Sequence, residues 1–269
     1  PRHCGSPFQL GKLIRVHSLA CRSVDDGFSE RDAFLLNDVL EIGLGTSLHI
    51  REERISDDDD ACRLLYVSDV HLRRSRSDLL VRQVVKSARL CKPHAILLGG
   101  DLVDSVSELS HLGDLTSELR AVGQVFAIGG NHDDRVGIGY VRTAIERGGG
   151  NWIHDGYANI ANDSRSIVVS GPNADVPPEG DVRILCAHNP RIWRTAKQQG
   201  FDLVLAGHLH GCQVVAFEFR DRLFPGAAFY PYNFLSHQHG STRLVVSRGV
   251  SDLIPIRWRC PREVVLCHV

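Results

Sequence analysis

Short apolar runs that lead directly into histidine, aspartate or asparagine recur along this chain. The clearest covers residues 95–98, where four apolar residues lead through two glycines to Asp101. Such a run predicts a buried strand that ends in a tight turn. One glycine–aspartate pair after a strand is more often a capped turn than a functional site. The pattern is nevertheless repeated, at Ser68-Asp69-Val70-His71, Gly130-Asn131-His132, Ala187-His188-Asn189 and Gly207-His208-Leu209-His210.

Helical periodicity separates the first three of these runs from one another. Strands over 63–68, 94–98 and 124–128 alternate with helices over about 77–90, 106–122 and 139–147, the second of them interrupted at Gly113. This order predicts a mostly parallel sheet with right-handed crossovers. The later elements are expected to be shorter: strands near 151–154, 157–161, 166–170, 182–187, 202–206, 213–220, 243–248 and 262–268, and one helix over 190–199.

The weakest pattern lies in residues 1–45, where we expect one amphipathic helix over 29–40. An edge strand is expected over 46–55, and residues 46–269 are expected to form a single domain, which a chain of 269 residues can support. The acidic run over 57–60 lacks the glycine and terminal glutamate of a calcium loop. A solvated turn is therefore the better interpretation of that run.

Composition narrows the class of protein further. The chain is 43% hydrophobic and 23% charged, and its net charge of -1 gives no basic footprint for nucleic acid. No run is long enough to span a membrane, so we expect a cytoplasmic protein, with peripheral membrane attachment left open. The chain starts at Pro1 and contains no methionine, so a natural start or an anchor can lie upstream. The eight cysteines form no Cys-x-x-Cys pair, which predicts reduced core residues.

The strand-end residues together form a set of metal ligands. In an open α/β sheet, function gathers at the carboxyl ends of the strands. Oxygen and nitrogen ligands without thiolate suit Mn, Fe, Zn, Ni or Co rather than a structural zinc site. Seven ligands are too many for one ion and suit two ions that share a carboxylate, for which Asp101 is the natural bridge. The expected ligands are Asp69, His71, Asp101, Asn131, His188, His208 and His210.

Local geometry and neighbouring residues add to this hypothesis. Alternation along an extended chain would aim both side chains of Asp69 and His71 to one side, and the same holds for His208 and His210. His132 need not be a ligand, since at the mouth of the site it could donate a proton to a leaving oxygen.

Several other polar residues keep two interpretations. Asp104 and Asp133 fit supporting or capping groups better than ligands. Arg248 and Arg257 could steer a phosphate or form salt bridges at the edge of the core. The aromatic and histidine side chains of 224–240 are expected in a loop over the mouth of the site, where packing or surface exposure competes with substrate contact.

The five blocks resemble the signature of calcineurin-like metallophosphoesterases, over roughly residues 60–269. The blocks are Asp69-Val70-His71, Gly100-Asp101, Gly130-Asn131-His132, His188 and Gly207-His208-Leu209-His210. The residues that extend these blocks, as in Gly100-Asp101-Leu102-Val103-Asp104, resemble the bacterial branch of YkuE/YaeI-type phosphodiesterases. That branch includes UDP-2,3-diacylglucosamine diphosphatase-like enzymes.

This resemblance implies a four-layer α/β/β/α sandwich with two divalent metal ions, manganese favoured. It implies a hydroxide that bridges the ions and attacks phosphorus, and His132 as the group that assists the departing oxygen. Matched position by position, one ion takes Asp69, His71, Asp101 and His210, and the other takes Asp101, Asn131, His188 and His208.

We therefore expect a metal-dependent phosphoester hydrolase, either a phosphodiesterase or a pyrophosphatase. The resemblance also implies a phosphoester or nucleotide-linked lipid as substrate. A scaffold that keeps the fold and binds a protein partner is the alternative, disfavoured because every ligand is present. Among enzymes, a phosphomonoesterase remains open, and a nuclease is weakened by the neutral charge and the lack of an aromatic-basic groove. The sequence leaves the oligomeric state open.

Overall fold

The computed structural model describes residues 40–43, 48–56, 58, 61–161, 165–174 and 179–269. The helix expected over 29–40 lies outside these residues except for Leu40, which belongs to a strand. The acidic run over 57–60 also lies outside them except for Asp58, which is exposed.

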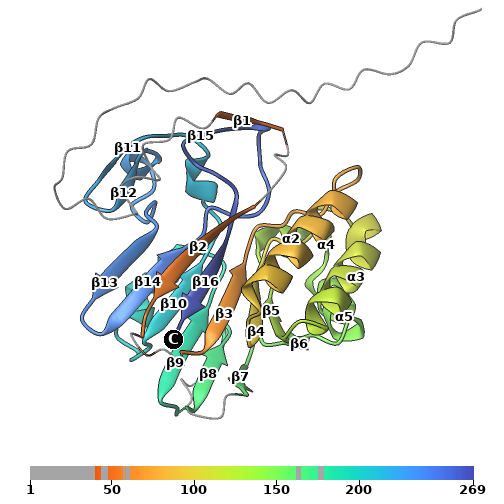
Figure 1. The fold of residues 1–269 in the computed structure, drawn as a ribbon, viewed down its shortest axis with the longest axis horizontal. Coiled ribbons are helices and arrows are strands. Elements are labelled where there is room, and N and C mark those ends of the chain that lie inside the picture. Colours follow the sequence, from red (N-terminus) through yellow and green to blue (C-terminus); the bar gives the residue numbers. More distant parts are fainter. Residues whose placement is uncertain (1–39, 44–47, 57, 59–60, 162–164, 175–178) are drawn as a thin grey trace, which may run out of the picture.

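The first of two six-stranded sheets has three helices packed on its outer face (Figure 1). Strands β3, β4, β5 and β6 are parallel, whereas β16 runs antiparallel to β3 and carries β2 at the edge, as expected for that segment. The strands are β2 (His49–Arg54), β16 (Glu263–His268), β3 (Arg63–Val67), β4 (Ala95–Gly99), β5 (Gln124–Ile128) and β6 (Asn151–Trp152). The helices are α2 (Ser77–Cys91), α3 (Leu109–Arg120) and α5 (Ile138–Arg147).

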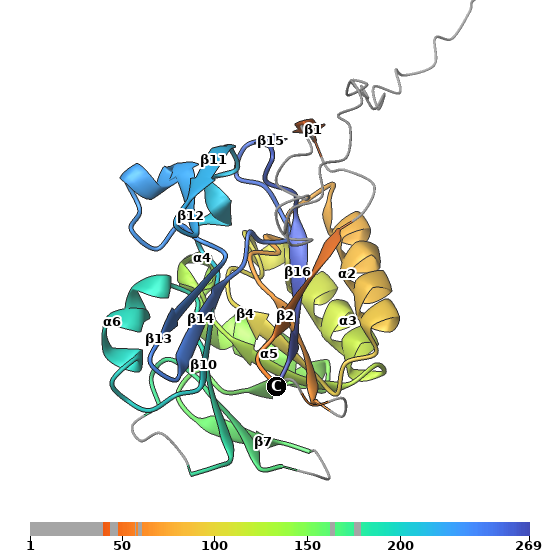
Figure 2. The ribbon, with the colours of Figure 1, turned by 60° about the vertical axis from the view of Figure 1, so that its left-hand side comes forward.

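The second sheet has a parallel centre and an antiparallel strand at each edge. Its order is β13 (Ser236–His239), β14 (Thr242–Val246), β10 (Leu203–Ala206), β9 (Val182–Cys186), β8 (Ile167–Ser170) and β7 (Tyr157–Ile160). A short helix, α6 (Trp193–Ala196), follows the 3₁₀ turn η2 (Pro190–Ile192) and lies beyond this sheet, on the side away from α2 and α3 (Figure 2). The helix expected over 190–199 is therefore much shorter than predicted.

Three clusters of buried side chains separate the layers. Alternate residues of β3 point to opposite clusters: Leu65 and Val67 pack toward the helices, and Leu64 and Tyr66 pack toward the other sheet. A third cluster, which includes Trp193, packs α6 onto the second sheet. Because both faces of the central strands are buried, the strands appear in the sequence as continuous apolar runs. The order helices, sheet, sheet and helix is the α/β/β/α arrangement that the resemblance implied.

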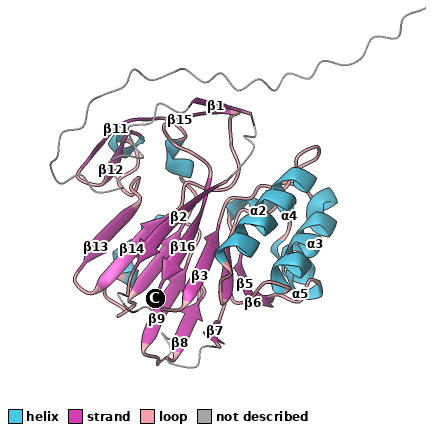
Figure 3. Cartoon of the chain, viewed as in Figure 1, coloured by secondary structure: helices cyan, strands magenta, loops and turns pink. Residues whose placement is uncertain are grey.

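Smaller elements complete the structure. The 3₁₀ turn η1 (Val106–Glu108) precedes α3, and a short helix α4 (Asn131–Val136) lies directly after β5. Two small antiparallel pairs lie at the upper end of the molecule in Figures 1 and 3: β1 (Leu40–Ile42) with β15 (Ile256–Trp258), and β11 (Val215–Phe219) with β12 (Arg222–Pro225). The remaining 3₁₀ turns are η3 (His210–Cys212) and η4 (Gly226–Ala228).

Two expectations about local structure were wrong. Gly113 does not interrupt its helix, because α3 continues through it and packs closely on α5, where a Cβ at Gly148 would lie 2.6 Å from the Gly113 carbonyl oxygen. The segment 224–240 is not one loop, since it contains the end of β12, the turn η4 and the whole of β13.

Two further findings concern the class of protein. The described part of the chain contains no helix that is long and apolar enough to cross a membrane. Of the six cysteines in the described ranges, four are buried, which confirms the core position predicted for those four.

Candidate metal centre

The ligand-bearing segments leave the strands in an unusual backbone conformation. Non-glycine residues with positive φ are uncommon and cost on the order of 1 kcal/mol each or more. The extended backbone expected at the Asp69/His71 and His208/His210 pairs was therefore wrong, because five of the seven candidate ligands have left-handed backbone angles. The φ angles are 57° at Asp69, 46° at His71, 52° at Asp101, 74° at His208 and 50° at His210.

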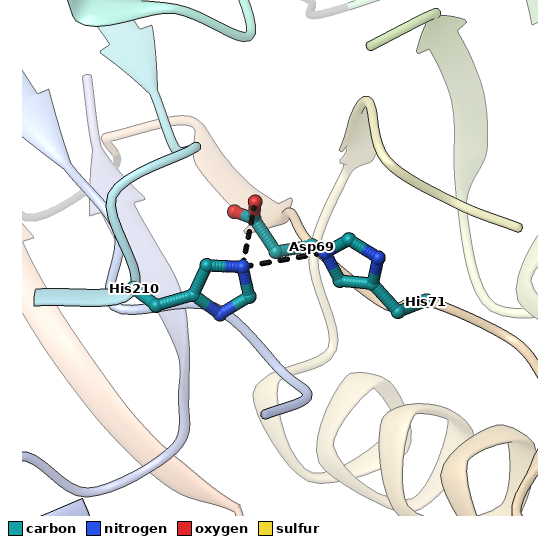
Figure 4. Close-up of side chains that lie close together, drawn as sticks. All are labelled: Asp69, His71 and His210. Carbon is teal, nitrogen blue, oxygen red and sulfur yellow. Dashed lines mark hydrogen bonds and ion pairs between the residues drawn. The ribbon is translucent and has the colours of Figure 1, made fainter. Parts of the chain in front are cut away.

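Asp69, His71 and His210 form the first group of ligands, which we call the closed group (Figure 4). The Nε2 atoms of His71 and His210 lie 3.3 Å apart, and His210 Nε2 lies 3.4 Å from Asp69 Oδ1. All three residues are at most 2% exposed. The end of β3 and the segment after β10 therefore meet here, although they belong to different sheets.

Both imidazoles of the closed group are anchored at their other nitrogen. His210 Nδ1 lies 3.0 Å from the Ser251 carbonyl oxygen, and His71 Nδ1 lies 2.7 Å from Asp104 Oδ1. Because a carbonyl only accepts, His210 donates from Nδ1, and its neutral ring presents a lone pair at Nε2. Two ring nitrogens 3.3 Å apart can share a proton or coordinate a metal ion placed between them. The donor set therefore fits a divalent metal ion, with its outer partners in place.

Asp101, His188 and His208 form the second group, which we call the open group. His188 Nε2 lies 3.1 Å from Asp101 Oδ2 and 3.2 Å from His208 Nδ1. His188 Nδ1 donates to the Gly99 carbonyl oxygen at 3.0 Å, so Nε2 is the nitrogen that faces the other ligands. His208 is only partly buried, which leaves this group accessible from solvent.

Asp101 lies between the two groups. Its Oδ2 atom is 3.1 Å from His188 Nε2 and 3.8 Å from His71 Nε2, while Oδ1 accepts the backbone N–H of His132 at 2.8 Å. A Cβ at Gly130 would lie 2.3 Å from that Oδ1, so only glycine permits the approach. Asn131 begins α4 between Gly130 and His132, both of which contact Asp101.

The buried carboxylates hold negative charge in the site. Burial alone would raise the pKa of Asp101, but the hydrogen bond and charge of His188 hold it well below its usual range. Burial also opposes ionisation of Asp69, and the charges of His210 and His188 outweigh it, so the pKa is lowered. Burial lowers the pKa of His210 to about 4, which keeps its ring neutral at pH 7. Burial alone would lower the pKa of His188, but its hydrogen bond to Asp101 and the nearby carboxylates outweigh burial and raise the pKa to about 9. Binding of a cation to the ionised aspartates would therefore displace the proton of that ring.

Asp104 joins His132 to the closed group. Its Oδ1 atom accepts from His71 Nδ1 at 2.7 Å and from His132 Nδ1 at 2.9 Å, and the two rings meet edge to face at 4.6 Å. His132 thus lies at the rim of the site, with 27% of its side chain exposed. Asp104, His71 and His132 also form a third group that could hold a metal ion, so the supporting role expected for Asp104 stays a prediction.

Asp133 has a backbone role. Its carboxylate accepts the N–H groups of Leu102, Val103 and Gly130 at 2.8–3.1 Å, which fastens the turn after Asp101 to the start of α4. This is the capping role expected for it.

The sequence left two roles open for Arg248 and Arg257, and both residues are buried. Arg248 is 2% exposed and is paired with Glu263, and Arg257 is 1% exposed and is paired with Asp252. Salt bridges, not phosphate steering, are therefore their role in this structure. Ser251 was not predicted from the sequence, because it contacts His210 through its carbonyl, a group that every residue carries.

Several known proteins are similar to this chain. The phosphodiesterase YaeI of Escherichia coli K12 is 28% identical over 226 residues, which cover 77% of this chain and 82% of that protein. The metallophosphoesterase YkuE of Bacillus subtilis is 24% identical, over 77% of this chain and 78% of its own length. An uncharacterized metallophosphoesterase of Helicobacter pylori J99 is 25% identical, and this chain spans 59% of its length. A solved archaeal phosphodiesterase superposes with a TM-score of 0.41 at 10% identity, over 70% of this chain and 84% of that one.

Residues 62–212, more than half of the chain, match the family described as calcineurin-like phosphoesterase. This match spans every candidate ligand from Asp69 to His210. The chain therefore belongs to the calcineurin-like phosphoesterases, in the branch of YaeI and YkuE, and is a hydrolase of phosphoester bonds.

Proposed function

We propose that this protein is a phosphodiesterase or pyrophosphatase with a dinuclear metal centre. The observation that carries the proposal is the position of Asp101, whose Oδ2 lies within 3.8 Å of a ring nitrogen from each ligand group. One ion would be held by Asp69, His71, His210 and Asp101, and the other by Asp101, Asn131, His188 and His208.

The ligand types favour manganese, with iron, zinc, nickel or cobalt also compatible. When bound, the two cations would supply a hydroxide nucleophile at neutral pH and neutralise charge on the phosphoryl oxygens. The chain's own part is to hold seven side chains in place before substrate arrives. Rings anchored at Nδ1 by Asp104, the Gly99 carbonyl and the Ser251 carbonyl need no reorganisation during the reaction.

His132 is proposed as the group that protonates the departing oxygen. It lies at the rim of the site, where a substrate can reach it, and Asp104 accepts its Nδ1 proton. That hydrogen bond leaves Nε2 to carry the proton that an alcohol leaving group needs. Asp104 thereby serves both His71, a proposed ligand, and the proposed acid.

The proposal extends to substrate and domain organisation. A diester substrate is supported by the name of the relative, phosphodiesterase YaeI, whereas a diphosphate or a nucleotide-linked lipid is supported by the resemblance to that branch. We propose a single metallophosphoesterase domain over 46–269, to which β1 adds by pairing with β15. A cytoplasmic location with peripheral membrane attachment would suit such a substrate.

The first test compares hydrolysis of bis-p-nitrophenyl phosphate with that of p-nitrophenyl phosphate, with added manganese and with chelator. We expect manganese-dependent cleavage of the diester in preference to the monoester. Asp101→Ala should lower kcat/KM by about 10³-fold or more, because loss of a shared ligand removes several kcal/mol of transition-state stabilisation. Asp134→Ala is the matched control, an exposed aspartate on α4 that should leave the activity unchanged.

A folded protein that hydrolyses neither compound with any divalent metal, and that does not bind two ions, would contradict the proposal. The fold would then serve as a scaffold.

A further inference from the structure

Residues 247–252, which we call the brace loop, connect the two sheets beside the closed group. The Ser247 N–H donates to the Ala206 carbonyl at the end of β10, at 2.8 Å. A few residues later the Val250 and Ser251 N–H groups donate to the carbonyls of Ser68 and Asp69, both at 3.0 Å. The loop therefore fixes the end of one sheet relative to the end of the other. The closed group takes ligands from both ends, so its geometry depends on this loop.

The brace loop also contacts the ligands directly. The Ser251 carbonyl accepts the Nδ1 proton of His210 at 3.0 Å. Gly249 has a φ of +78°, and a Cβ there would lie 2.9 Å from Asp69 Cβ and 3.3 Å from His210 Nδ1. The loop thus lies against two of the three closed-group ligands.

The Arg257 guanidinium holds the brace loop in this shape. It donates to the Ser251 carbonyl at 2.7 Å and to the Arg248 carbonyl at 2.9 Å, and its Nε donates to Asp252 Oδ1 at 2.5 Å. Its Nη1 atom donates to the Cys260 carbonyl at 3.1 Å. A rigid planar fork can satisfy acceptors in several directions, which the single ammonium of lysine cannot reproduce.

We propose that Arg257 is a positioning residue of the metal centre. Together with Asp252, it fixes the Ser251 carbonyl, and that carbonyl holds the His210 ring with Nε2 toward Asp69 and His71. Outer partners of this kind typically change metal affinity by about 10–100-fold when they are removed. The inference rests on the proposed dinuclear function, because it assigns Arg257 to one of the two ions.

Arg51 provides a matched control. It is also buried, at 9% exposure, and it also pairs with carboxylates, Glu263 and Glu53. Its backbone partner is the Val246 carbonyl at 2.8 Å, which precedes the brace loop. Substitution of Arg51 therefore tests the loss of a buried ion pair without loss of a donor to Ser251.

The experiment measures binding of Mn²⁺ to the metal-free full chain by titration calorimetry, for wild type, Arg257→Lys and Arg51→Lys. We expect two ions in wild type, and in Arg257→Lys one ion weakened about 10–100-fold with the other changed less than about threefold. Arg51→Lys should lower the melting temperature of the metal-free protein and bind both ions as wild type does. In a His210→Ala background, Arg257→Lys should cause no further loss, because the two changes act through the same ligand.

The outcomes separate the two proposals. Binding of two ions by Arg257→Lys with wild-type affinity, or equal weakening of both ions, would overturn the role of Arg257. Failure of wild type to bind two ions would instead overturn the dinuclear centre. If Arg257→Lys does not fold, Asp252→Asn replaces it, since it removes the negative charge that pairs with Arg257 Nε but keeps an oxygen acceptor, and it should weaken the same ion by a smaller factor.

Discussion

The closed group and the open group contain the same kinds of side chain but differ in their surroundings. Every member of the closed group is at most 2% exposed, and its two imidazoles are anchored by Asp104 and by the brace loop. In the open group, His188 is anchored by the Gly99 carbonyl, whereas the ring contact of His208 is with His188 itself, and His208 is partly exposed. A dry, anchored site should bind its ion tightly, and a site open on one side can exchange its ion and admit substrate.

The largest predicted loss of activity compares one histidine of the closed group with one of the open group. His210→Ala should lower the rate of diester hydrolysis by about 10³-fold. The substitution removes one ligand nitrogen and leaves a buried gap beside the other two members of the closed group, Asp69 and His71. His208→Ala should cost about tenfold less and should recover in excess manganese, since water can take a position that is open to solvent. Steady-state kinetics over a manganese titration measures both. Equal losses that excess manganese restores equally would mean that the two groups do not differ.

A buried ion-pair network joins β2, the brace loop and β16 through Arg51, Arg248 and Glu263, and its failure should appear as lost stability. Burial alone would raise the pKa of Glu263 above its ordinary 4.5, but Arg248 and Arg51 outweigh burial and lower the pKa to about 2. A lowered pKa stabilises the fold above pH 4.5 by about 3 kcal/mol, a contribution that is lost as the pH falls toward 2. Glu263→Gln should therefore lower the free energy of unfolding by about 3 kcal/mol at pH 7, and by less at pH 3.

Urea unfolding at both pH values measures that difference. Glu146→Gln is the control, because its partner Arg142 and Glu146 itself are both exposed, and such a pair is worth about 0–1 kcal/mol. A loss for Glu263→Gln that is the same at pH 7 and pH 3 would contradict the ionised, paired state of Glu263.

The effect of substituting His132, at the rim of the site, should depend on the leaving group of the substrate and not on the metal ion. His132→Ala should lower kcat/KM about 10²-fold for diesters of weakly acidic alcohols, which need a proton as they leave. For p-nitrophenyl esters the loss should be below about tenfold, because that leaving group departs as a stable anion. His237→Ala, at an exposed histidine of β13, should match wild type. Equal losses for both classes of ester would remove His132 from the role of acid.

The two halves of the chain differed in how well the sequence predicted them. Strands β3, β4 and β5 and helices α2 and α5 lie within a few residues of their predicted bounds, because periodic segments there end at glycine or proline. In the second half, β12 and β13 are short strands in a segment rich in aromatic residues, glycine and proline, and the composition indicated a loop. Helix α6 ends at Ala196 instead of residue 199, so the helical layer on the second sheet is smaller than predicted.

The candidate ligands could be predicted, whereas the means of holding them could not. Strand ends that deliver Asp, His and Asn are visible as letters in the sequence. The left-handed φ angles of Asp69 and His208 are fixed by hydrogen bonds between distant segments, such as the Asp69 N–H to the Gly100 carbonyl at 3.0 Å. The role of the Ser251 carbonyl depends on Arg257, which is brought beside it only by the folded brace loop. Such contacts have no local pattern that a sequence analysis can detect.

The smallest predicted effect compares a glycine of the brace loop with one on the helical side of the molecule. Gly249→Ala places a Cβ 2.9 Å from Asp69 Cβ at a φ of +78°, so it should lower the free energy of unfolding by about 1–3 kcal/mol and weaken one bound ion. Gly139→Ala, in α5, meets no atom within 4 Å and should raise that free energy by about 0.5–1 kcal/mol. Chemical denaturation with and without manganese measures both. If Gly249→Ala matched wild type in both conditions, the brace loop would not press on the closed group, and the rigidity of that group would have to come from His71 and Asp104 alone.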